Sequence, residues 1–295
     1  MKCGVFGFPE YTEPAIRLAR ELGVPYRDVA LRQFPDGESL VRVSAPPETA
    51  ILYRSLDHPN GKIVELLLAA SALRANGAKR VVLVVPYLAY MRQDVAFQPG
   101  EAVSQRVIGR LLAQHCDELL TVDAHLHRTR ALTEIMPGIE AANVSAAPIL
   151  SAALDAHDNP LLVGPDAESR QWVEAIARPR GLEFLLGRKR RLGDRAVDLA
   201  IDDVERAAGR PAVLVDDLVS SGETMKAAAG LLREAGATRV VALATHCLAG
   251  ARDLVDIGRA GISSLRTTDT VSGPTGSIHV AALLAQEMTR RGWLE

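Results

Sequence analysis

The segment 213–225, VLVDDLVSSGETM, combines residues that could bind a phosphorylated sugar. Its apolar first half predicts a buried strand, and the residues from Met225 onward have helical periodicity. A turn that leads from a strand into a helix offers backbone N–H groups and the positive end of the helix dipole, which together bind phosphate. Ser220, Ser221 and Thr224 would add hydroxyl donors. A glycine at 222 would let the backbone close around the phosphate oxygens.

Asp216 and Asp217 stand directly before this turn, and their negative charges do not suit the phosphate itself. Carboxylates accept hydrogen bonds from sugar hydroxyls and ligate Mg²⁺, directly or through water. The segment therefore predicts a site for a phosphorylated sugar together with a metal ion. An ordinary helix N-cap is the alternative for the two aspartates alone, and the full string of strand, acids, hydroxyls and glycine disfavours it.

The composition is that of a globular protein without a basic or membrane-directed character. Of 295 residues, 48% are hydrophobic and 24% are charged, which allows a large core and, by length, about two domains. The formal charge of -2 provides no basic field, so we expect neither nucleic acid nor a membrane as partner. Three scattered cysteines and the lack of a leader or a long apolar run favour a cytoplasmic location.

Short β-branched runs alternate along the chain with longer stretches of helical periodicity. This alternation predicts an α/β fold in which helices flank a parallel sheet. The predicted helices include 63–75, 103–116, 147–157 and 225–235. The predicted strands are 41–43, 50–53, 80–85, 118–122, 161–163, 183–186, 213–215 and 240–244.

The chain also contains an internal repeat. LRANGAKRVVLV at 73–84 resembles LREAGATRVVAL at 232–243, and each predicts a helix end, a glycine and the next strand. The same offset places Asp216 opposite Asp57 and LVSSGET opposite PNGKIVE. We infer two domains of one architecture, with the acidic turn kept in the second domain and degraded in the first.

Six further segments carry clustered charged, polar and glycine residues: RQFPDGES (32–39), VVPYLAYMRQD (84–94), FQPGEAVSQRV (97–107), VDAHLHR (122–128), VGPDAESR (163–170) and GRKRRLGDR (187–195). Together with the phosphate turn, they resemble the ribose-phosphate pyrophosphokinase family and occur in the order in which that family has them. The turn itself is similar to the phosphoribosyl pyrophosphate motif that this family shares with type I phosphoribosyltransferases. A duplicated domain is typical of the pyrophosphokinases.

The resemblance implies two tandem phosphoribosyltransferase-like domains, each a mostly parallel sheet flanked by helices. The expected boundaries are 1–145 for the ATP side, 146–275 for the ribose 5-phosphate side, and 276–295 for a C-terminal helix that could pack back on the first domain. The implied reaction transfers the β,γ-pyrophosphoryl group of ATP to the C1 hydroxyl of D-ribose 5-phosphate. The products are 5-phosphoribosyl 1-pyrophosphate and AMP, which serve nucleotide biosynthesis.

An ATP site is implied in the first domain. Arg92 and Gln93 follow a predicted strand, and a cation beside an amide suits a polyphosphate. His125 lies just past another predicted strand, where the family has a histidine associated with the metal and the ATP phosphates. The resemblance therefore implies that Arg92, Gln93 and His125 bind ATP.

The segment RQFPDGES predicts a turn with Phe34 exposed. An aromatic ring with nearby carboxylates could bind an adenine, and in related enzymes this loop reaches the ATP site of a neighbouring subunit. Phe34, Asp36 and Glu38 are therefore expected to bind ATP in a homo-oligomer, a dimer or larger, with the ATP site shared between subunits.

Mg²⁺ is the cofactor that the resemblance implies, with His125 and Asp166 as its ligands. The family usually has two glycines where this chain has Glu168 and Ser169, which leaves the local geometry and the metal stoichiometry open.

Lys189 and Arg191 belong to four consecutive cations that follow a predicted strand. Such a run is most often a solvated face, but the resemblance places it where related enzymes have a catalytic loop. It implies that Lys189 and Arg191 stabilise the charge that develops during phosphoryl-type transfer.

For ribose 5-phosphate, the resemblance implies that Asp216 and Asp217 orient the ribose while residues 220–224 hold its 5-phosphate. Glu223 departs from the family's glycine, and its carboxylate would repel the phosphate if it pointed into the turn. We predict that Glu223 faces solvent or the first turn of the helix, where an acid is favoured.

Two other functions stay open from the sequence. A phosphoribosyltransferase that consumes phosphoribosyl pyrophosphate would need only one such domain and would leave RQFPDGES and PYLAYMRQD unexplained. A non-catalytic, synthetase-associated regulatory subunit is opposed by the retained Lys189, Arg191 and His125, although Glu168 and Glu223 depart from the family pattern.

Overall fold

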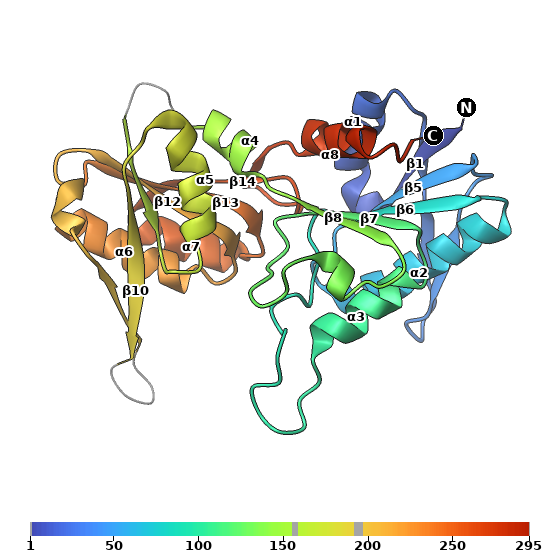
Figure 1. Ribbon diagram of the computed structural model, residues 1–295, viewed down its shortest axis with the longest axis horizontal. Coiled ribbons are helices and arrows are strands. Elements are labelled where there is room, and N and C mark those ends of the chain that lie inside the picture. Colours follow the sequence, from blue (N-terminus) through green and yellow to red (C-terminus); the bar gives the residue numbers. More distant parts are fainter. Residues whose placement is uncertain (1, 155–158, 192–196, 295) are drawn as a thin grey trace. The chain divides into compact units, whose positions relative to one another are not determined.

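The computed structural model describes residues 2–154, 159–191 and 197–294, and only the backbone of 189–191 and 197–198. The chain divides into two compact units, Met1–Ser145 with His279–Glu295 (unit 1) and Ala146–Ile278 (unit 2). Each unit is an α/β structure built on a mainly parallel sheet (Figure 1), which confirms the predicted fold class. No helix in the described part of the chain combines the length and the apolar character that a bilayer crossing requires.

Unit 1 contains a six-stranded sheet in the order β2-β1-β5-β6-β7-β8, and every pair in it is parallel. The central strands are buried along almost their whole length because helices cover both faces, α1 and α8 on one and α2 and α3 on the other (Figure 1). Its strands are β1 (Cys3–Gly7), β2 (Tyr26–Asp28), β5 (Thr49–Tyr53), β6 (Arg80–Val84), β7 (Glu118–Val122) and β8 (Glu140–Val144), and its helices are α1 (Thr12–Leu22), α2 (Pro59–Ala75), α3 (Ser104–Ala113) and α8 (Ala281–Arg290), with 3₁₀ turns at Pro9–Tyr11 and Leu132–Glu134.

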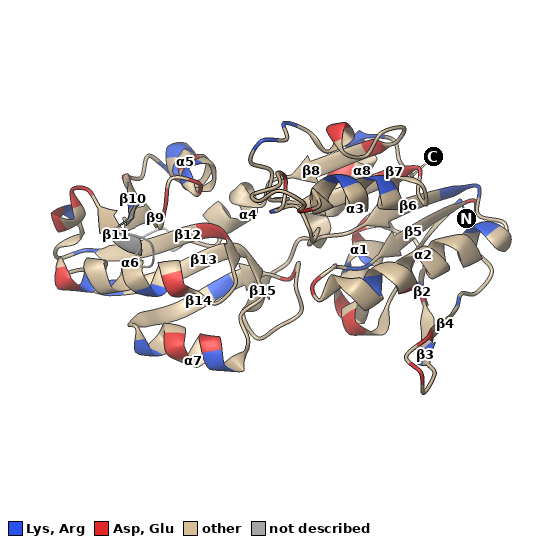
Figure 2. Cartoon of the chain, turned by 90° about the horizontal axis from the view of Figure 1, so that it is seen from below, with Lys and Arg blue, Asp and Glu red and all other residues tan. Residues whose placement is uncertain are grey.

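A separate two-stranded antiparallel hairpin, β3 (Ala30–Gln33) and β4 (Ser39–Arg42), belongs to the same unit. It extends away from the main sheet (Figure 2). Gly37 has φ 93° in the connecting loop, a conformation that favours glycine. The backbone N–H of Phe34 donates to the Glu38 carbonyl at 2.8 Å and closes this loop.

Unit 2 contains a seven-stranded sheet in the order β11-β10-β9-β12-β13-β14-β15, in which only the β10–β11 pair is antiparallel among the described strands. Helices α4 and α5 lie on one face and α6 and α7 on the other (Figure 1). Its strands are β9 (Leu161–Gly164), β10 (Phe184–Arg191), β11 (Val197–Ile201), β12 (Pro211–Val219), β13 (Arg239–Cys247), β14 (Ile262–Thr268) and β15 (Gly276–Ile278), and its helices are α4 (Ala147–Ala152), α5 (Arg170–Ala177), α6 (Glu223–Glu234) and α7 (Ala251–Arg259), with 3₁₀ turns at Arg178–Arg180 and Val204–Ala207.

The internal repeat is a structural repeat. The N–H of Ala78 donates to the Leu73 carbonyl at the end of α2, and the N–H of Ala237 donates to the Leu232 carbonyl at the end of α6, both at 3.0 Å. The glycines between each helix and its strand, Gly77 and Gly236, have φ 107° and 89°. The same helix end therefore leads into β6 in unit 1 and into β13 in unit 2, as the repeat predicted.

Two sequence-based expectations need correction. The strand predicted over 213–215 extends as β12 to Val219, because Leu218 and Val219 are apolar and pair in parallel with His246 and Cys247 of β13. Asp216 and Asp217 therefore lie within the strand and not beyond its end. The helix predicted over 147–157 ends as α4 at Ala152, and the last part of the predicted range, 155–157, lies outside the described residues.

Candidate active site

The turn between β12 and α6 presents the residues that the sequence singled out for phosphate. Ser220 and Ser221 are exposed, and Gly222 is buried with φ 73°. A Cβ atom at 222 would lie 2.6 Å from the Ile257 side chain, so both the conformation and the packing require glycine here. No side chain caps α6, whose first N–H groups therefore point out of the helix without an intrahelical acceptor. The turn can accept an anion.

Glu223 begins α6, and its side chain is 76% exposed. Its carboxylate accepts a hydrogen bond from Lys226 at 2.5 Å, three residues along the helix. The first helical bond runs from the N–H of Lys226 to the Gly222 carbonyl at 2.8 Å. The acid thus faces solvent on the first turn of the helix, which confirms the predicted orientation and leaves the turn clear of a carboxylate.

Three carboxylates gather at the adjacent edge of the unit 2 sheet. Asp217 is buried, Asp216 is half-buried, and the N–H of Asp217 donates to Asp216 Oδ1 at 3.0 Å. Burial and the negative charges of Asp217 and Asp166 raise the pKa of Asp216 well above its ordinary value. Among the described residues, no cation forms an ion pair with Asp216. The arrangement suits a cation or a group that donates hydrogen bonds.

Asp166 follows β9, the neighbour of β12 in the sheet. Its Oδ1 accepts the N–H groups of Glu168 at 3.0 Å and of Ser169 at 3.3 Å, while the Ser169 hydroxyl donates to the Asp166 carbonyl at 2.6 Å. Ser169 has φ -71° and ψ -8°, a conformation open to any residue. Its hydroxyl occupies the space that a Cβ on Gly164 would need. The chain therefore carries serine at 169, in place of the family's usual glycine, without backbone strain at this position.

In unit 1 the structure joins two loops that carry the ATP candidates. Arg92 is exposed and Gln93 half-buried in the loop between β6 and α3, and the Gln93 side chain accepts a hydrogen bond from Ser104 at 2.5 Å. His125 is half-buried just past β7, where its ring meets the His127 ring edge-on with centroids 4.1 Å apart. The N–H of Ala124 donates to Asn143 of β8 at 2.8 Å and supports this second loop.

Sequence reasoning assigned no role to the residues that tie these loops together. The Asp94 side chain, only 1% exposed, accepts hydrogen bonds from the Arg128 guanidinium at 2.8 Å and from the Arg128 N–H at 3.2 Å. Gln105, also 1% exposed, donates to the Met91 carbonyl at 3.1 Å and accepts the Thr129 hydroxyl at 2.7 Å. Both residues lie inside segments that the sequence singled out, Asp94 in 84–94 and Gln105 in 97–107. Their burial, which marks them as connecting residues, is seen only in the structure.

The hairpin candidates Phe34, Asp36 and Glu38 lie at and beside the tip of the β3–β4 hairpin. Asp36 and Glu38 are exposed, and Asp36 accepts the N–H of Glu38 at 3.1 Å. Phe34 was expected to be exposed but is half-buried, because the Arg32 guanidinium lies 5.3 Å from its ring centre. The turn predicted for this segment is confirmed as the loop between β3 and β4. The predicted exposure of Phe34 is wrong, because its ring is partly covered.

The predicted catalytic cations were expected to follow the strand predicted over 183–186, but they lie within it, because β10 continues to Arg191 by pairing with β11. The backbones of Lys189 and Arg191 pair with Leu199 and Val197 of β11, and their side chains lie outside the part of the chain that the structure describes. Their roles stay predictions. The neighbouring Arg188 forms an ion pair with Asp202.

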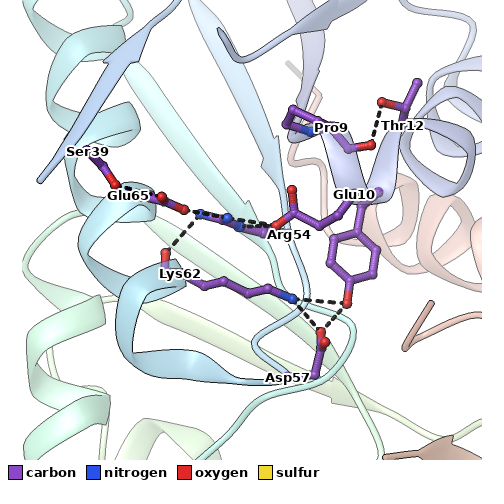
Figure 3. A network of polar contacts seen from close by, with 9 residues as sticks. Pro9, Glu10, Thr12, Ser39, Arg54, Asp57, Lys62 and Glu65 are labelled. Carbon is purple, nitrogen blue, oxygen red and sulfur yellow. Dashed lines mark hydrogen bonds and ion pairs between the residues drawn. The ribbon is translucent and has the colours of Figure 1, made fainter. Parts of the chain in front are cut away.

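The turn in unit 1 that corresponds to β12–α6 is occupied by the chain itself (Figure 3). Lys62 donates to Asp57 at 2.8 Å, and the Tyr11 hydroxyl also hydrogen-bonds to Asp57. Beside them, the buried Arg54 donates to Glu10 at 2.8 Å and to Glu65 at 2.6 Å, with its guanidinium 3.9 Å from the Phe8 ring centre. Every charge in this turn has an opposite charge nearby, so the turn offers no site for phosphate.

Two family models match the chain. Residues 4–115 match the model described as the N-terminal domain of ribose phosphate pyrophosphokinase, and residues 131–265 match the phosphoribosyl transferase domain. The ribose-phosphate pyrophosphokinase of Methanopyrus kandleri is 35% identical over 277 residues, which cover 92% of this chain and 93% of that protein. The ribose-phosphate pyrophosphokinase of Thermococcus kodakarensis is 35% identical over 263 residues, which cover 88% of this chain and 92% of that protein.

A solved structure shares the fold. The crystal structure of phosphoribosylpyrophosphate synthetase from Mycobacterium smegmatis matches with a TM-score of 0.83 at 24% sequence identity, with 100% of both chains covered.

Proposed function

This chain belongs to the ribose-phosphate pyrophosphokinase family, and we propose that it forms 5-phosphoribosyl 1-pyrophosphate and AMP from ATP and D-ribose 5-phosphate. The observation that carries this conclusion is the 35% identity to a ribose-phosphate pyrophosphokinase along 92% of the chain, through both units. A protein with one phosphoribosyltransferase domain would leave unit 1 and its paired loops without a role.

Ribose 5-phosphate is assigned to the β12–α6 turn. The N–H groups at the start of α6 and the hydroxyls of Ser220, Ser221 and Thr224 would bind the 5-phosphate, and Gly222 gives them access. Asp216 and Asp217 would accept hydrogen bonds from the ribose hydroxyls and so fix the orientation of the anomeric carbon. The side chain of Glu223 faces solvent, so this residue would contribute its backbone N–H at the start of α6 and not its carboxylate.

ATP is assigned to the loops of unit 1 that carry Arg92, Gln93 and His125. The hairpin residues Phe34, Asp36 and Glu38 would complete the adenine end of the site in a neighbouring copy of the chain. Support for this lies in the separation of the hairpin from the main sheet and the exposure of both acids at its tip. We therefore propose a homo-oligomer with a shared ATP site, which sedimentation of the parent and of a Phe34→Ala variant would test.

Mg²⁺ is the metal proposed, and the acids of unit 2 fit a hard cation. The pKa of Asp216 is raised because the partial burial of its carboxyl group and the negative charges of Asp217 and Asp166 disfavour its ionised form, and a divalent cation would relieve that repulsion. Asp166 and His125 are the residues proposed to hold the metal. When bound, Mg²⁺ would neutralise part of the charge on the ATP phosphates.

In the proposed reaction, the anomeric hydroxyl oxygen of ribose 5-phosphate attacks the β-phosphorus of ATP. The bond between the β-phosphorus and the α,β-bridging oxygen breaks, AMP leaves, and the hydroxyl proton passes to solvent. The β,γ-pyrophosphoryl group moves intact, so no covalent enzyme intermediate is needed. The chain would contribute alignment through Asp216, Asp217 and the turn, and charge stabilisation through Lys189 and Arg191.

We also propose a cytoplasmic location. Cys3, Cys116 and Cys247 are free thiols, and burial raises the pKa of Cys116 to about 12, so this side chain stays protonated and unreactive. Three unpaired thiols are typical of a reducing compartment.

Incubation with ATP, Mg²⁺ and ribose 5-phosphate tests the function directly. We expect one AMP for each 5-phosphoribosyl 1-pyrophosphate formed, resolved by anion-exchange chromatography. Release of pyrophosphate that depends on an added nucleobase, without AMP, would instead identify a phosphoribosyltransferase. A Lys189→Ala variant is expected to lose turnover and keep ATP binding; unchanged turnover would exclude the role assigned to this residue.

A further inference from the structure

A buried amide and a buried carboxylate connect the two ATP-binding loops of unit 1 on both sides of Arg92 and Gln93. The Gln105 side chain reaches the residue before this pair, by donating to the Met91 carbonyl at 3.1 Å. Asp94 is the residue after the pair, and it accepts the Arg128 guanidinium at 2.8 Å. The loop is thus held at each end of its two ligand candidates.

The same two residues hold the histidine loop. The Thr129 hydroxyl donates to Gln105 Oε1 at 2.7 Å, and the N–H of Arg128 donates to Asp94 Oδ2 at 3.2 Å. Arg128 and Thr129 follow His125 and His127 directly in the chain. The Gln105 amide therefore joins Met91 to Thr129, and the Asp94 carboxylate joins its own loop, at the position after Gln93, to Arg128.

The burial of these two side chains makes the loss of their hydrogen bonds costly. The side chains of Asp94 and Gln105 are each 1% exposed, so a lost hydrogen bond would leave a buried polar group without solvent to replace its partner. Gln105 also lies in the first turn of α3, where its N–H donates to the Gln93 carbonyl at 3.2 Å. The helix that carries the amide is therefore fixed to the loop that it positions.

We propose that Gln105 and Asp94 are positioning residues that set the spacing between the Arg92–Gln93 loop and the His125 loop for the polyphosphate of a nucleoside triphosphate. This inference rests on the proposed function of unit 1. Neither residue needs to touch the nucleotide. A preset spacing lowers the cost of binding a flexible, highly charged polyphosphate, and a displacement of about 1 Å in such a site can reduce the rate by ~100-fold.

A Gln105→Met variant tests the proposal, because methionine has a similar volume and removes both side-chain hydrogen bonds. We expect kcat/KM for ATP to fall about tenfold or more, mainly through a higher KM for ATP, while KM for ribose 5-phosphate changes less than about twofold. Calorimetric titration with a non-hydrolysable ATP analogue and Mg²⁺ should show the same weakening. Gln114→Met, the same change at an exposed position just past α3, is the matched control.

A Thr129→Val variant provides a second, milder test, since it removes one hydrogen bond with almost no change in volume. We expect a loss of about threefold in kcat/KM for ATP, in the same direction. If Gln105→Met fails to fold, as judged by thermal unfolding, this variant and the analogue titration decide alone. An unchanged ATP affinity in a folded variant, or an equal loss for ATP and ribose 5-phosphate, would overturn the proposal. A parent protein that forms no AMP would refute the proposed function instead.

Discussion

The two strand-to-helix turns of the repeat differ in which groups surround their aligned aspartates, Asp57 in unit 1 and Asp216 in unit 2. In unit 1, Asp57 meets Lys62 from the first turn of α2 and the Tyr11 hydroxyl. In unit 2, Asp216 meets two further carboxylates, and no described cation pairs with it. The charge of Asp57 is neutralised within the chain. The repulsion among the carboxylates around Asp216 is unfavourable, and a bound ligand or metal ion would reduce it.

The helix start explains how one repeat gives two outcomes. In the register of the repeat, Pro59 aligns with Leu218 and Lys62 with Ser221. Proline favours the first position of a helix, so α2 begins at Pro59, whereas β12 still continues at Leu218. The earlier helix brings Lys62 onto Asp57 and removes the open turn. The open turn in unit 2 depends on a longer strand and on the left-handed Gly222.

The largest effect is expected from Gly222→Ala. An added Cβ would meet Ile257 at 2.6 Å in a backbone conformation with φ 73°, so the turn must shift. We expect KM for ribose 5-phosphate to rise about 100-fold or more, because the N–H groups at the start of α6 leave the positions that bind phosphate. Steady-state kinetics measure this effect, and binding of the ATP analogue should stay at the parent level. A normal KM for ribose 5-phosphate would show that the turn does not hold the phosphate.

The next largest effect is expected from Lys62→Met in unit 1. The variant removes the cation from a pair whose side chains are 16% and 15% exposed, and it leaves Asp57 with only part of its compensation. We expect a loss of about 1–3 kcal/mol in the free energy of unfolding. Denaturant unfolding measures it.

Ribose 5-phosphate titration of the same variant sharpens the comparison. Because α2 still begins at Pro59, no open turn should form, and the calorimetric stoichiometry should stay at one ribose 5-phosphate per chain. A second binding event would mean that Lys62 alone closes the unit 1 turn.

Aspartate-to-asparagine changes at the two aligned positions are expected to have opposite signs. The pKa of Asp216 is raised in the folded protein, so the folded state binds its proton more tightly than the unfolded state does. Stability therefore falls as the pH rises from the ordinary aspartate range through the raised pKa, so this carboxyl group destabilises the folded state more at high pH than at low pH. Asp216→Asn should gain about 1 kcal/mol near pH 8 and less near pH 4. Asp57→Asn should lose stability near pH 8, because Lys62 loses its partner.

Thermal unfolding across this pH range measures both variants. Added Mg²⁺ should stabilise the parent more than Asp216→Asn, which tests whether the acids of unit 2 hold a cation. If the stability of the parent and that of Asp216→Asn changed equally with pH, this result would contradict the raised pKa of Asp216.

The sequence allowed the α/β class, the repeat and most central strands to be predicted, because buried parallel strands are continuous apolar runs. RVVLV at β6 is such a run. Strands with a weak apolar pattern were not predicted. β1, CGVFG, contains two glycines, and the edge strand β15 has only three residues. The end of β12 was placed too early because acidic residues are uncommon in strands, although Leu218 and Val219 continue the ladder.

The candidate site was predictable where its residues are neighbours in the chain, as at 216–224. Contacts between distant segments were not, since neither Asp94–Arg128 nor Thr129–Gln105 leaves a periodic trace in the sequence. The closed state of the unit 1 turn also needed the structure. The sequence indicated that the acidic turn had degenerated there, but the Lys62–Asp57 pair depends on where α2 begins.

The smallest effect is expected from Gly61→Ala, the same glycine-to-alanine change in the unit 1 turn, where Gly61 aligns with Ser220. Gly61 lies in the first turn of α2, exposed, with no atom within 4 Å of an added Cβ and without a left-handed backbone. Alanine should stabilise the helix by about 0.5–1 kcal/mol and leave both KM values unchanged, because glycine is unfavourable inside a helix. Thermal unfolding and steady-state kinetics measure the two effects. A glycine-to-alanine change that impaired ribose 5-phosphate binding here as well would mean that the unit 1 turn is not the closed counterpart of the β12–α6 turn.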